Sequence, residues 1–184
     1  MWVAAQKEGR LNLIDFGGSL GSTYYQNKKL LDRLKHVSWN IVEQPEFVSV
    51  GVESFQNEIV RFYHSISECC SESKEKTDVI LFSSVLQYLD NPFDILMEAF
   101  SCGIKFIIVD RTGFTLNNKQ RITIQKVSPT IYDASYPCRF FSEKEFLTYF
   151  EENNYELIVE FVALDTVNIP SKYKGFIFQL KEND

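Results

Sequence analysis

The chain has 184 residues, of which 45% are apolar and 24% are charged, and its formal net charge is -6. This length and composition predict one ordinary globular domain with a substantial core, and the acidic charge argues against a large nonspecific nucleic-acid surface. A small-molecule substrate is therefore the better expectation.

The cysteines and histidines exclude the common metal sites. No C-x-x-C pair occurs among the four cysteines (Cys69, Cys70, Cys102 and Cys138), and the chain has only 2 histidines. We therefore expect reduced thiols and no metal ion. No stretch approaches the ~20 apolar residues of a membrane span, and the N-terminus lacks the pattern of a signal peptide. We expect a cytoplasmic protein without a membrane span.

Residues 11–23, LNLIDFGGSLGST, are the most informative stretch. An apolar run typical of a buried strand ends in Asp15, passes through a glycine-rich turn and opens into a helix predicted over residues 24–34. Such a turn lets backbone N–H groups approach a bound nucleotide. The spacing D-x-G-x-x-x-G, with Ser19 where a middle glycine usually stands, does not fit the G-x-G-x-x-G of dinucleotide-binding proteins.

The next predicted strand, residues 38–43, ends in Glu43, twenty-two positions after Gly21. Nucleotide-binding α/β folds place a carboxylate at this point, at the tip of the second strand, to accept the ribose hydroxyls. A solvated acid at a strand end is the alternative. The agreement with the glycine turn favours the ribose.

Gln44 and a proline then begin a short helix, and residues 59–63 form a third predicted strand. His64 and Ser65 follow it and are candidate ligand contacts, although a lone histidine is more often structural. Residues 67–77 are polar and predict a surface linker or a poorly formed helix.

Residues 78–89, DVILFSSVLQYL, combine a buried strand with the small hydroxyl residues Ser83 and Ser84. These serines would lie at the carboxyl edge of the sheet, where small side chains leave room for ligands. A helix over residues 92–102 and a fifth strand over residues 104–109, ending before Asp110, continue the alternation. It predicts a mainly parallel sheet with helices on both faces.

Past Gly113 the alternation breaks for about thirty residues, longer than an ordinary connection. We interpret residues 111–141 as a substrate-side insertion or lid, and a packed irregular loop is an equal alternative. The candidate substrate contacts in it are Arg121, Tyr132, Tyr136 and Arg139. A capping box at Ser142 then starts a helix, and residues 155–164 and 175–180 predict a closing antiparallel pair.

Together, the glycine turn, Glu43, the segment SSVLQYL at residues 83–89 and the closing pair resemble the class I (Rossmann-like) S-adenosylmethionine-dependent methyltransferases. The resemblance follows the family's order along nearly the whole chain. It implies an α/β, Rossmann-like, mainly parallel seven-stranded sheet with helices on both faces and a C-terminal antiparallel hairpin. The stretches DFGGSLGSTYYQ, WNIVEQP and YPCRFFS also resemble a bacterial methyltransferase family associated with surface-polysaccharide genes.

The resemblance implies one methyltransferase-like domain over residues 1–184 with S-adenosyl-L-methionine as its cofactor. The residues implied to hold the methionine part are Asp15, Phe16, Gly17, Gly18 and Gly21. Glu43 would hold the ribose, Gln44 and Ser65 would face the adenine, and Ser83 and Ser84 would lie beside the methyl group. The chain departs from the family in its short N-terminal cap and in Ser19, which should be tolerated if the turn has a negative φ there.

A sulfonium methyl is already activated, so catalysis mainly requires an acceptor held in line, and a base is needed only where the acceptor loses a proton. Asp110 and His64 are the candidate bases, each with an ordinary structural role as an alternative. We expect methyl transfer to a small-molecule or glycan acceptor, preferentially at oxygen, with no nucleic-acid partner; a homodimer is compatible. The alternatives are a non-catalytic methyltransferase-like binding module and an NAD-dependent Rossmann oxidoreductase.

Overall fold

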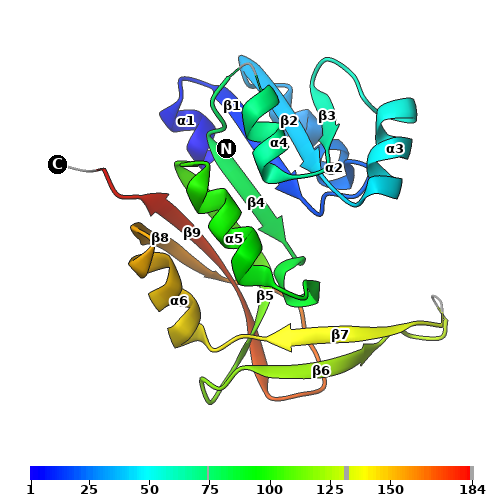
Figure 1. The fold of residues 1–184 in the computed structure, drawn as a ribbon, viewed down its shortest axis with the longest axis vertical. Helices are drawn as coiled ribbons and strands as arrows, with labels where there is room; N and C mark the ends of the chain where they lie inside the picture. Colours follow the sequence, from blue (N-terminus) through cyan, green and yellow to red (C-terminus); the bar gives the residue numbers. More distant parts are fainter. Residues whose placement is uncertain (74, 131–132, 183–184) are drawn as a thin grey trace. The chain divides into compact units, whose positions relative to one another are not determined.

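A computed structural model describes residues 1–73, 75–130 and 133–182 (Figure 1). The chain folds into two compact units, one with residues 1–83 and 93–108 and the other with residues 84–92 and 109–184. Each unit contains a cluster of buried apolar side chains.

The elements before the fifth strand are, in chain order, α1 (Trp2–Gln6), β1 (Arg10–Phe16), α2 (Ser22–Leu31), β2 (His36–Val42), α3 (Pro45–Ser54), β3 (Val60–Tyr63), α4 (Ile66–Glu72), β4 (Val79–Ser83), the 3-10 helix η1 (Leu86–Tyr88) and α5 (Pro92–Ser101). Strand β5 (Phe106–Thr115) begins in the first unit and ends in the second. The elements that follow are β6 (Arg121–Lys126), β7 (Ser135–Phe140), α6 (Glu143–Glu152), β8 (Tyr155–Val162) and β9 (Ser171–Leu180).

Seven strands form one sheet in the order β3-β2-β1-β4-β5-β9-β8. Strand β1 is parallel to β2 and β4, β2 is parallel to β3, and β8 and β9 are antiparallel. The predicted fold class is confirmed, including the closing hairpin. Strands β6 and β7 form a separate antiparallel pair.

The core of the first unit follows from the alternation of side chains along its strands. Leu11 and Leu13 of β1 and Trp39 and Ile41 of β2 point to one face, where they pack against buried side chains of α1, α2 and α3. Helix α4 contacts β1, β2 and β3 (Figure 1). Helices therefore cover both faces of these strands.

The expectation of a linker or poorly formed helix over residues 67–77 is wrong for its first part. Helix α4 is regular, and the Ser65 hydroxyl caps it by accepting the Glu68 N–H at 3.0 Å. Two residues of this helix, Ile66 and Cys69, are buried. The polar composition of this stretch concealed a single apolar face.

The alternative of an irregular loop past Gly113 is also wrong. Strand β5 continues to Thr115, and the antiparallel pair β6–β7 follows it. Gly113 is required in β5 because a Cβ there would lie 2.8 Å from the Phe140 ring. Large aromatic side chains fill the core of the second unit, among them Phe150 and Phe178, whose rings stack at 3.7 Å.

Among the described residues, no helix is both long and apolar enough to cross a membrane.

Candidate functional site

Strands β1 to β4 end at one level. Phe16 of β1 pairs with Val42 of β2 and with Phe82 of β4. Val42 pairs in turn with Tyr63 of β3. The residues that follow these positions are Gly17, Glu43, His64 and Ser83. They share the carboxyl edge of the sheet within the first unit, which is where open α/β sheets bind their ligands.

The turn after β1 has a left-handed backbone at three positions. The φ angle is 72° at Gly17, 52° at Ser19 and 91° at Gly21. The positive φ at Ser19 therefore does not meet the condition under which the serine is expected to be tolerated without strain. A side chain in this region costs ~1–2 kcal/mol, so the serine keeps the turn's conformation at an energetic cost that a glycine avoids.

Gly18 allows the Asp15 carboxyl group to lie against the turn. A Cβ at residue 18 would lie 2.6 Å from Cγ of Asp15 and 2.7 Å from its Oδ2. No real Cβ approaches so closely, so any larger residue would displace the carboxylate. Phe16, the last residue of β1, packs its ring 5.3 Å from that of Phe82.

Glu43 joins the tip of β2 to the glycine turn. Its Oε1 accepts the N–H of Ser19 at 3.0 Å, and its Oε2 accepts the N–H of Gln44 at 2.8 Å. The Gly17 N–H also donates to the carbonyl of Val42 at 2.9 Å. A carboxylate offers about four lone-pair positions, so Glu43 keeps acceptor capacity for further donors.

The Asp15 carboxyl group is the most perturbed acid of this edge. Burial raises its pKa from 3.8 to about 6, the Trp39 hydrogen bond opposes the rise, and the negative charge of Glu43 adds to it. The side chain is only 2% exposed. A cation placed beside this carboxylate would be stabilised by it.

The remaining candidates of the first unit have local roles. Gln44 is exposed and is the N-cap residue of α3. The Ser65 hydroxyl accepts from Glu68, which leaves its own proton for a ligand. The His64 side chain is exposed, and its backbone N–H donates to Oε2 of Glu68 at 2.6 Å.

In the second unit, Gln87 links two backbone positions that are also left-handed, Ser84 with φ 55° and Arg111 with φ 52°. Its Nε2 donates to the Ser84 hydroxyl at 3.2 Å and to the Arg111 carbonyl at 3.1 Å. Its Oε1 is buried without a hydrogen-bond partner among the described residues. Buried acceptors normally find a donor, so this oxygen is suited to an N–H or O–H group of a ligand.

Next to Gln87, two tyrosines share one glutamine. The Tyr88 hydroxyl donates to Oε1 of Gln125 at 3.2 Å, and Nε2 of Gln125 lies 3.4 Å from the Tyr136 hydroxyl. The two rings meet edge to face at 5.3 Å. Burial raises the pKa of Tyr88 above its usual value, so the phenol is a neutral hydrogen-bonding group at pH 7.

Another candidate of this unit, Arg139, lies beside η1. Its Nη2 donates to the Asp90 carbonyl at 3.0 Å. Its Nε is buried and has no hydrogen-bond partner in the described part of the chain. Oδ1 of Asp110 accepts the N–H of Arg111 at 2.8 Å. Arg121 lies four residues along β6 from Gln125, ~13 Å away, and is not part of the tyrosine cluster. Tyr132 lies outside the described residues.

Sequence reasoning missed Trp39, Gln87 and Tyr88 as members of these arrangements. Gln87 and Tyr88 stand directly after the serines of β4, in the segment that carries the resemblance, and this position is a usable signal. No such signal identifies Trp39, because a tryptophan inside an apolar strand predicts only a buried core residue.

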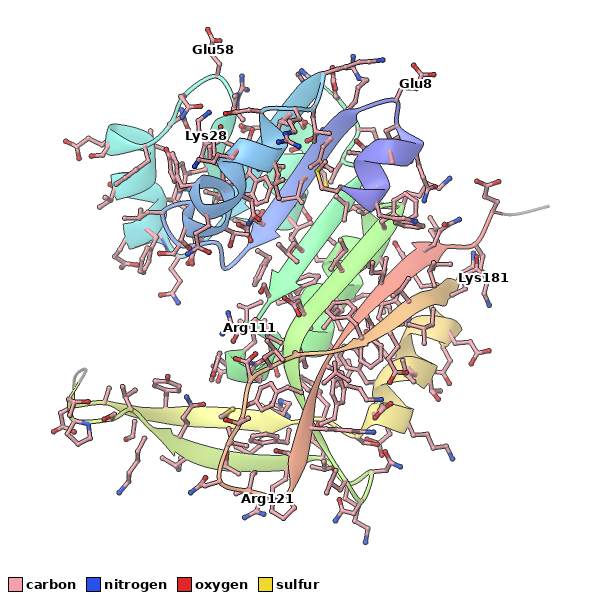
Figure 2. The ribbon with its side chains drawn as sticks, turned by 180° about the vertical axis from the view of Figure 1, so that it is seen from behind. Glu8, Lys28, Glu58, Arg111, Arg121 and Lys181 are labelled. Carbon is pink, nitrogen blue, oxygen red and sulfur yellow. The ribbon has the colours of Figure 1, made fainter. Side chains whose placement is uncertain are left out.

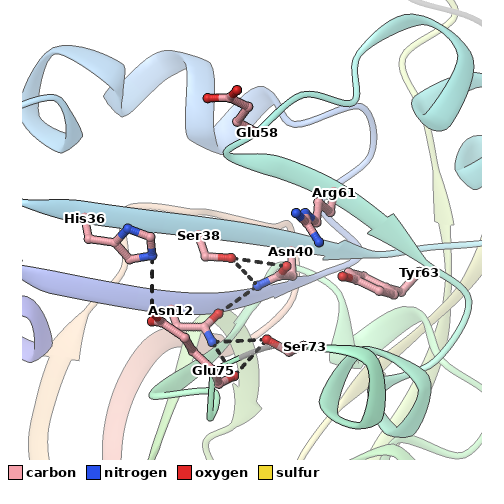
Figure 3. Close-up of a pocket in the computed structure, with 9 residues that line it drawn as sticks. All are labelled: Asn12, His36, Ser38, Asn40, Glu58, Arg61, Tyr63, Ser73 and Glu75. Atoms are coloured by element: carbon pink, nitrogen blue, oxygen red, sulfur yellow. Dashed lines mark hydrogen bonds and ion pairs between the residues drawn. The ribbon is translucent and has the colours of Figure 1, made fainter.

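A polar cavity of about 130 Å³, separate from this edge, is lined by side chains of β1, β2 and β3 together with Glu58, Ser73 and Glu75 (Figure 3). Asn40 donates to Oδ1 of Asn12 at 2.8 Å, and Asn12 donates to the Glu75 carbonyl at 2.8 Å. Both amides are thus satisfied within the protein. This network fixes the chain between α4 and β4.

No protein-family model and no curated protein matches the sequence. Solved structures do match the fold. An S-adenosylmethionine-dependent methyltransferase from Methanosarcina mazei aligns with a TM-score of 0.66 at 12% identity, over 95% of each chain. Magnesium protoporphyrin IX methyltransferase from Synechocystis, solved with bound S-adenosylmethionine, aligns with a TM-score of 0.60 at 12% identity, over 98% of this chain and 75% of its own.

A pericyclic reaction enzyme is also similar, with a TM-score of 0.62 at 8% identity, over 98% of this chain and 47% of its own. The chain spans about half the length of that enzyme. The same architecture therefore serves more than one kind of reaction. What the three alignments establish is that this chain has the Rossmann-like fold of S-adenosylmethionine-dependent methyltransferases.

Proposed function

We propose that the chain binds S-adenosylmethionine at the carboxyl edge of β1–β4 and transfers its methyl group to the oxygen of a small-molecule or glycan acceptor. The observation that carries the proposal is the hydrogen bond from the Ser19 N–H to Glu43, which holds a carboxylate of β2 against the glycine turn of β1. The similar structure from Synechocystis, solved with bound S-adenosylmethionine, supports the choice of ligand.

Glu43 is the proposed ribose-binding residue. A ribose diol requires an acceptor for two hydroxyl hydrogens, and Glu43 retains lone pairs after its two backbone hydrogen bonds. Gln44 and Ser65 follow the neighbouring strand ends and would border the adenine. The Ser65 hydroxyl can donate its proton while it caps α4.

The glycine turn is the proposed contact for the methionine part of the cofactor, through Asp15, Phe16, Gly17, Gly18 and Gly21. Burial raises the pKa of the Asp15 carboxyl group, and a neighbouring ammonium group would favour the charged form. We therefore expect the bound amino group to lower the pKa of Asp15. The absence of a side chain at Gly18 is what leaves Asp15 in contact with the turn.

When bound, the cofactor supplies a methyl group on a positively charged sulfur, so the chain has to align the acceptor and exclude water. Ser83 and Ser84 are the proposed neighbours of the methyl group. The proposed acceptor contacts come from residues 84–92 and from the insertion 111–141. They are Arg121, Tyr132, Tyr136 and Arg139, to which the geometry adds Gln87 and Tyr88.

For a hydroxyl acceptor, Asp110 and His64 remain the proposed bases. Oδ1 of Asp110 is oriented by the hydrogen bond that it accepts from the Arg111 N–H. The His64 side chain is exposed. Asp110→Asn and His64→Gln, compared in a methyl-transfer assay, would separate the two.

The decisive experiment is calorimetric titration of the full chain with S-adenosylhomocysteine, with NAD as the competing ligand. We expect micromolar binding of S-adenosylhomocysteine, no binding of NAD, and at least a tenfold loss in Glu43→Gln, because a bond to a charged group contributes ~1.5–3 kcal/mol. Glu58→Gln is the matched control, since Glu58 is an exposed acid just before β3, away from the carboxyl ends of the strands (Figure 2).

Binding of NAD alone would favour the oxidoreductase. Binding of S-adenosylhomocysteine that Glu43→Gln and Glu58→Gln leave unchanged would place the ligand elsewhere. If the cofactor binds as expected, incubation with S-adenosylmethionine and a panel of sugars and small metabolites separates an enzyme from a binding module, because only an enzyme forms S-adenosylhomocysteine.

The four cysteines are free thiols, Cys69, Cys70, Cys102 and Cys138. Free thiols suit a reducing compartment, so we propose that the protein acts in the cytoplasm. The resemblance to methyltransferases of surface-polysaccharide genes makes nucleotide sugars and glycan precursors the first acceptors to test.

A further inference from the structure

A groove runs along the edge of β6 that is not paired with β7. One part, of about 660 Å³, is lined by all six residues of β6 together with Phe140 and residues 166–169. An adjoining part, of about 390 Å³, is lined by residues of the β5–β6 connection together with Arg121, Ile169 and Pro170. We call the two parts together the β6 groove. Arg121 and Ile169 line both, and Arg121 is labelled on β6 in Figure 2.

The backbone of β6 presents hydrogen-bonding groups on this side. The Val127 N–H donates to the Ala134 carbonyl, which continues the ladder beyond the pairs of β6 with β7. Narrow and wide pairs alternate in an antiparallel ladder, so the N–H and C=O groups of Ile122, Ile124 and Lys126 point away from β7. Pro137, the partner of Ile124, agrees with this register, because it has no N–H to donate across the ladder.

The side chains at this edge combine apolar surface with positive charge. Ile122 is 58% exposed and Ile124 is 64% exposed. Lys119, Arg121 and Lys126 line the groove, and among the described residues no aspartate or glutamate does. Within the described parts of the chain, none of these three cations forms a salt bridge. An acid-free basic groove on a chain of net charge -6 is selective for an anionic occupant.

We propose that the β6 groove binds an extended acidic peptide segment of a partner protein, which adds a strand to the free edge of β6. Main-chain hydrogen bonds to Ile122, Ile124 and Lys126 would hold the segment, and alternate apolar side chains would cover the isoleucines. Its carboxylates would lie on the opposite face, with Arg121, while Lys126 adds positive charge at the end of the isoleucine face. A second copy of β6 is a poor occupant, since self-pairing would gather the cations of both copies in one interface without bringing any described acid of the groove to oppose them.

The test uses a fluorescent six-residue peptide in which valine and glutamate alternate, titrated with the full chain and followed by polarisation. The matched probe is the same peptide with N-methyl groups on alternate amides, which keeps its charge and removes one edge of donors. We expect only the unmethylated peptide to bind, with an affinity that falls as salt is raised. Arg121→Gln with Lys126→Gln should weaken binding about three- to tenfold, and Lys144→Gln on α6 should not.

A second variant addresses the backbone directly. Ile124→Pro removes an outward N–H without touching the ladder to β7, so the hairpin should survive while peptide binding is lost. Amide exchange of Ile122 and Lys126 should slow when the peptide is bound. Equal binding of both peptides, no binding at millimolar concentration, or a dimer that Ile124→Pro dissociates would each overturn the proposal. S-adenosylhomocysteine binding is measured in parallel, and its outcome is independent of these.

Discussion

The indole Nε1 of Trp39 donates a hydrogen bond of 3.1 Å to Oδ2 of Asp15, so that a core residue of β2 fixes the carboxyl group at the end of β1. This bond acts on an acid that burial would otherwise push further toward its neutral form. The pair therefore couples the packing of two strands to the charge of the proposed cofactor site. Its consequences are measurable in the absence of any ligand.

Asp15→Asn should change how stability depends on pH. The native pKa of about 6 exceeds the reference value of 3.8, so the folded state holds a proton that the unfolded state has lost. The stability of the wild type therefore falls, relative to the variant, as pH rises from about 4 to about 6, and the difference stays constant above that. At pH 7.5 the variant should be more stable, by at most about 3 kcal/mol. Urea unfolding between pH 4 and pH 7.5 measures this difference.

Trp39→Phe is the companion variant, because it keeps an aromatic ring beside Tyr24 and removes the donor to Asp15. The pKa of Asp15 should rise further, which moves the fall in stability to higher pH, and the loss should be about 1–3 kcal/mol at neutral pH. If the free energies of unfolding of the wild type and Asp15→Asn differed by the same amount at every pH, the Asp15 carboxyl group would titrate normally.

Gly18→Ala should destabilise the chain by about 2–3 kcal/mol, because the new methyl group would lie 2.6 Å from Cγ of Asp15 and force that side chain away from Trp39. S-adenosylhomocysteine binding should be lost with it. The matched control is Gly103→Ala, where φ is 61° but no atom lies within 4 Å of the added Cβ. It should cost about 1 kcal/mol and leave binding intact. Equal losses in the two variants would exclude the close approach as the cause.

The order of the elements and the position of Glu43 could be predicted because they depend on local signals. Apolar runs, a glycine turn and an acid at a strand end specify parallel strands whose carboxyl ends meet, and the register of Phe16, Val42 and Phe82 is their direct consequence. Helix α4 was harder, since Ile66 and Cys69 are its only buried residues and the rest of its sequence is polar.

Three features depend on contacts between distant residues and leave no mark in the sequence. The hydrogen bond of Trp39 to Asp15 joins residues that look like separate core and site positions. The left-handed φ of Ser19 contradicts the ordinary preference of serine, and the hydrogen bond from its N–H to the distant Glu43 helps to hold this conformation. The unpaired edge of β6 follows from the pairing of β7, which the aromatic residues of the insertion do not reveal.

Glu143→Gln should destabilise the second unit above about pH 4.5. The Glu143 carboxylate bonds Nζ of Lys174 at 2.6 Å and Nζ of Lys172 at 2.5 Å, and although burial opposes it, these bonds lower the pKa of Glu143. The ion pairs of Glu143 therefore stabilise the folded state above the pKa that Glu143 has in the unfolded chain. This stabilisation is lost as pH falls through the lower pKa that Glu143 has in the folded chain. We expect a loss of about 1–3 kcal/mol at pH 7.

Glu145→Gln is the control for that variant, since it also removes a negative charge from the first turn of α6. It should cost only ~0.3–1 kcal/mol, the usual effect of a charge on the helix dipole. Urea unfolding of both variants at pH 7 and at pH 3.5 separates the two effects. If Glu143→Gln remained as costly at pH 3.5 as at pH 7, the loss would come from packing and not from the ion pairs.

Gln87→Met should cost about 1–2 kcal/mol, because it removes both donor bonds of the amide and leaves the Arg111 carbonyl without its partner. Gln87→Glu should destabilise the fold more at pH 7.5 than at pH 5. A buried carboxylate that faces the Arg111 carbonyl has a raised pKa, so the stability of this variant falls as pH rises above about 4.3, the ordinary pKa of a glutamate. Gln120→Met, at an exposed position, is the control and should be neutral. Urea unfolding at the two pH values measures all three, and a Gln87→Met variant as stable as the wild type would show that the amide does not hold Ser84 and Arg111 together in solution.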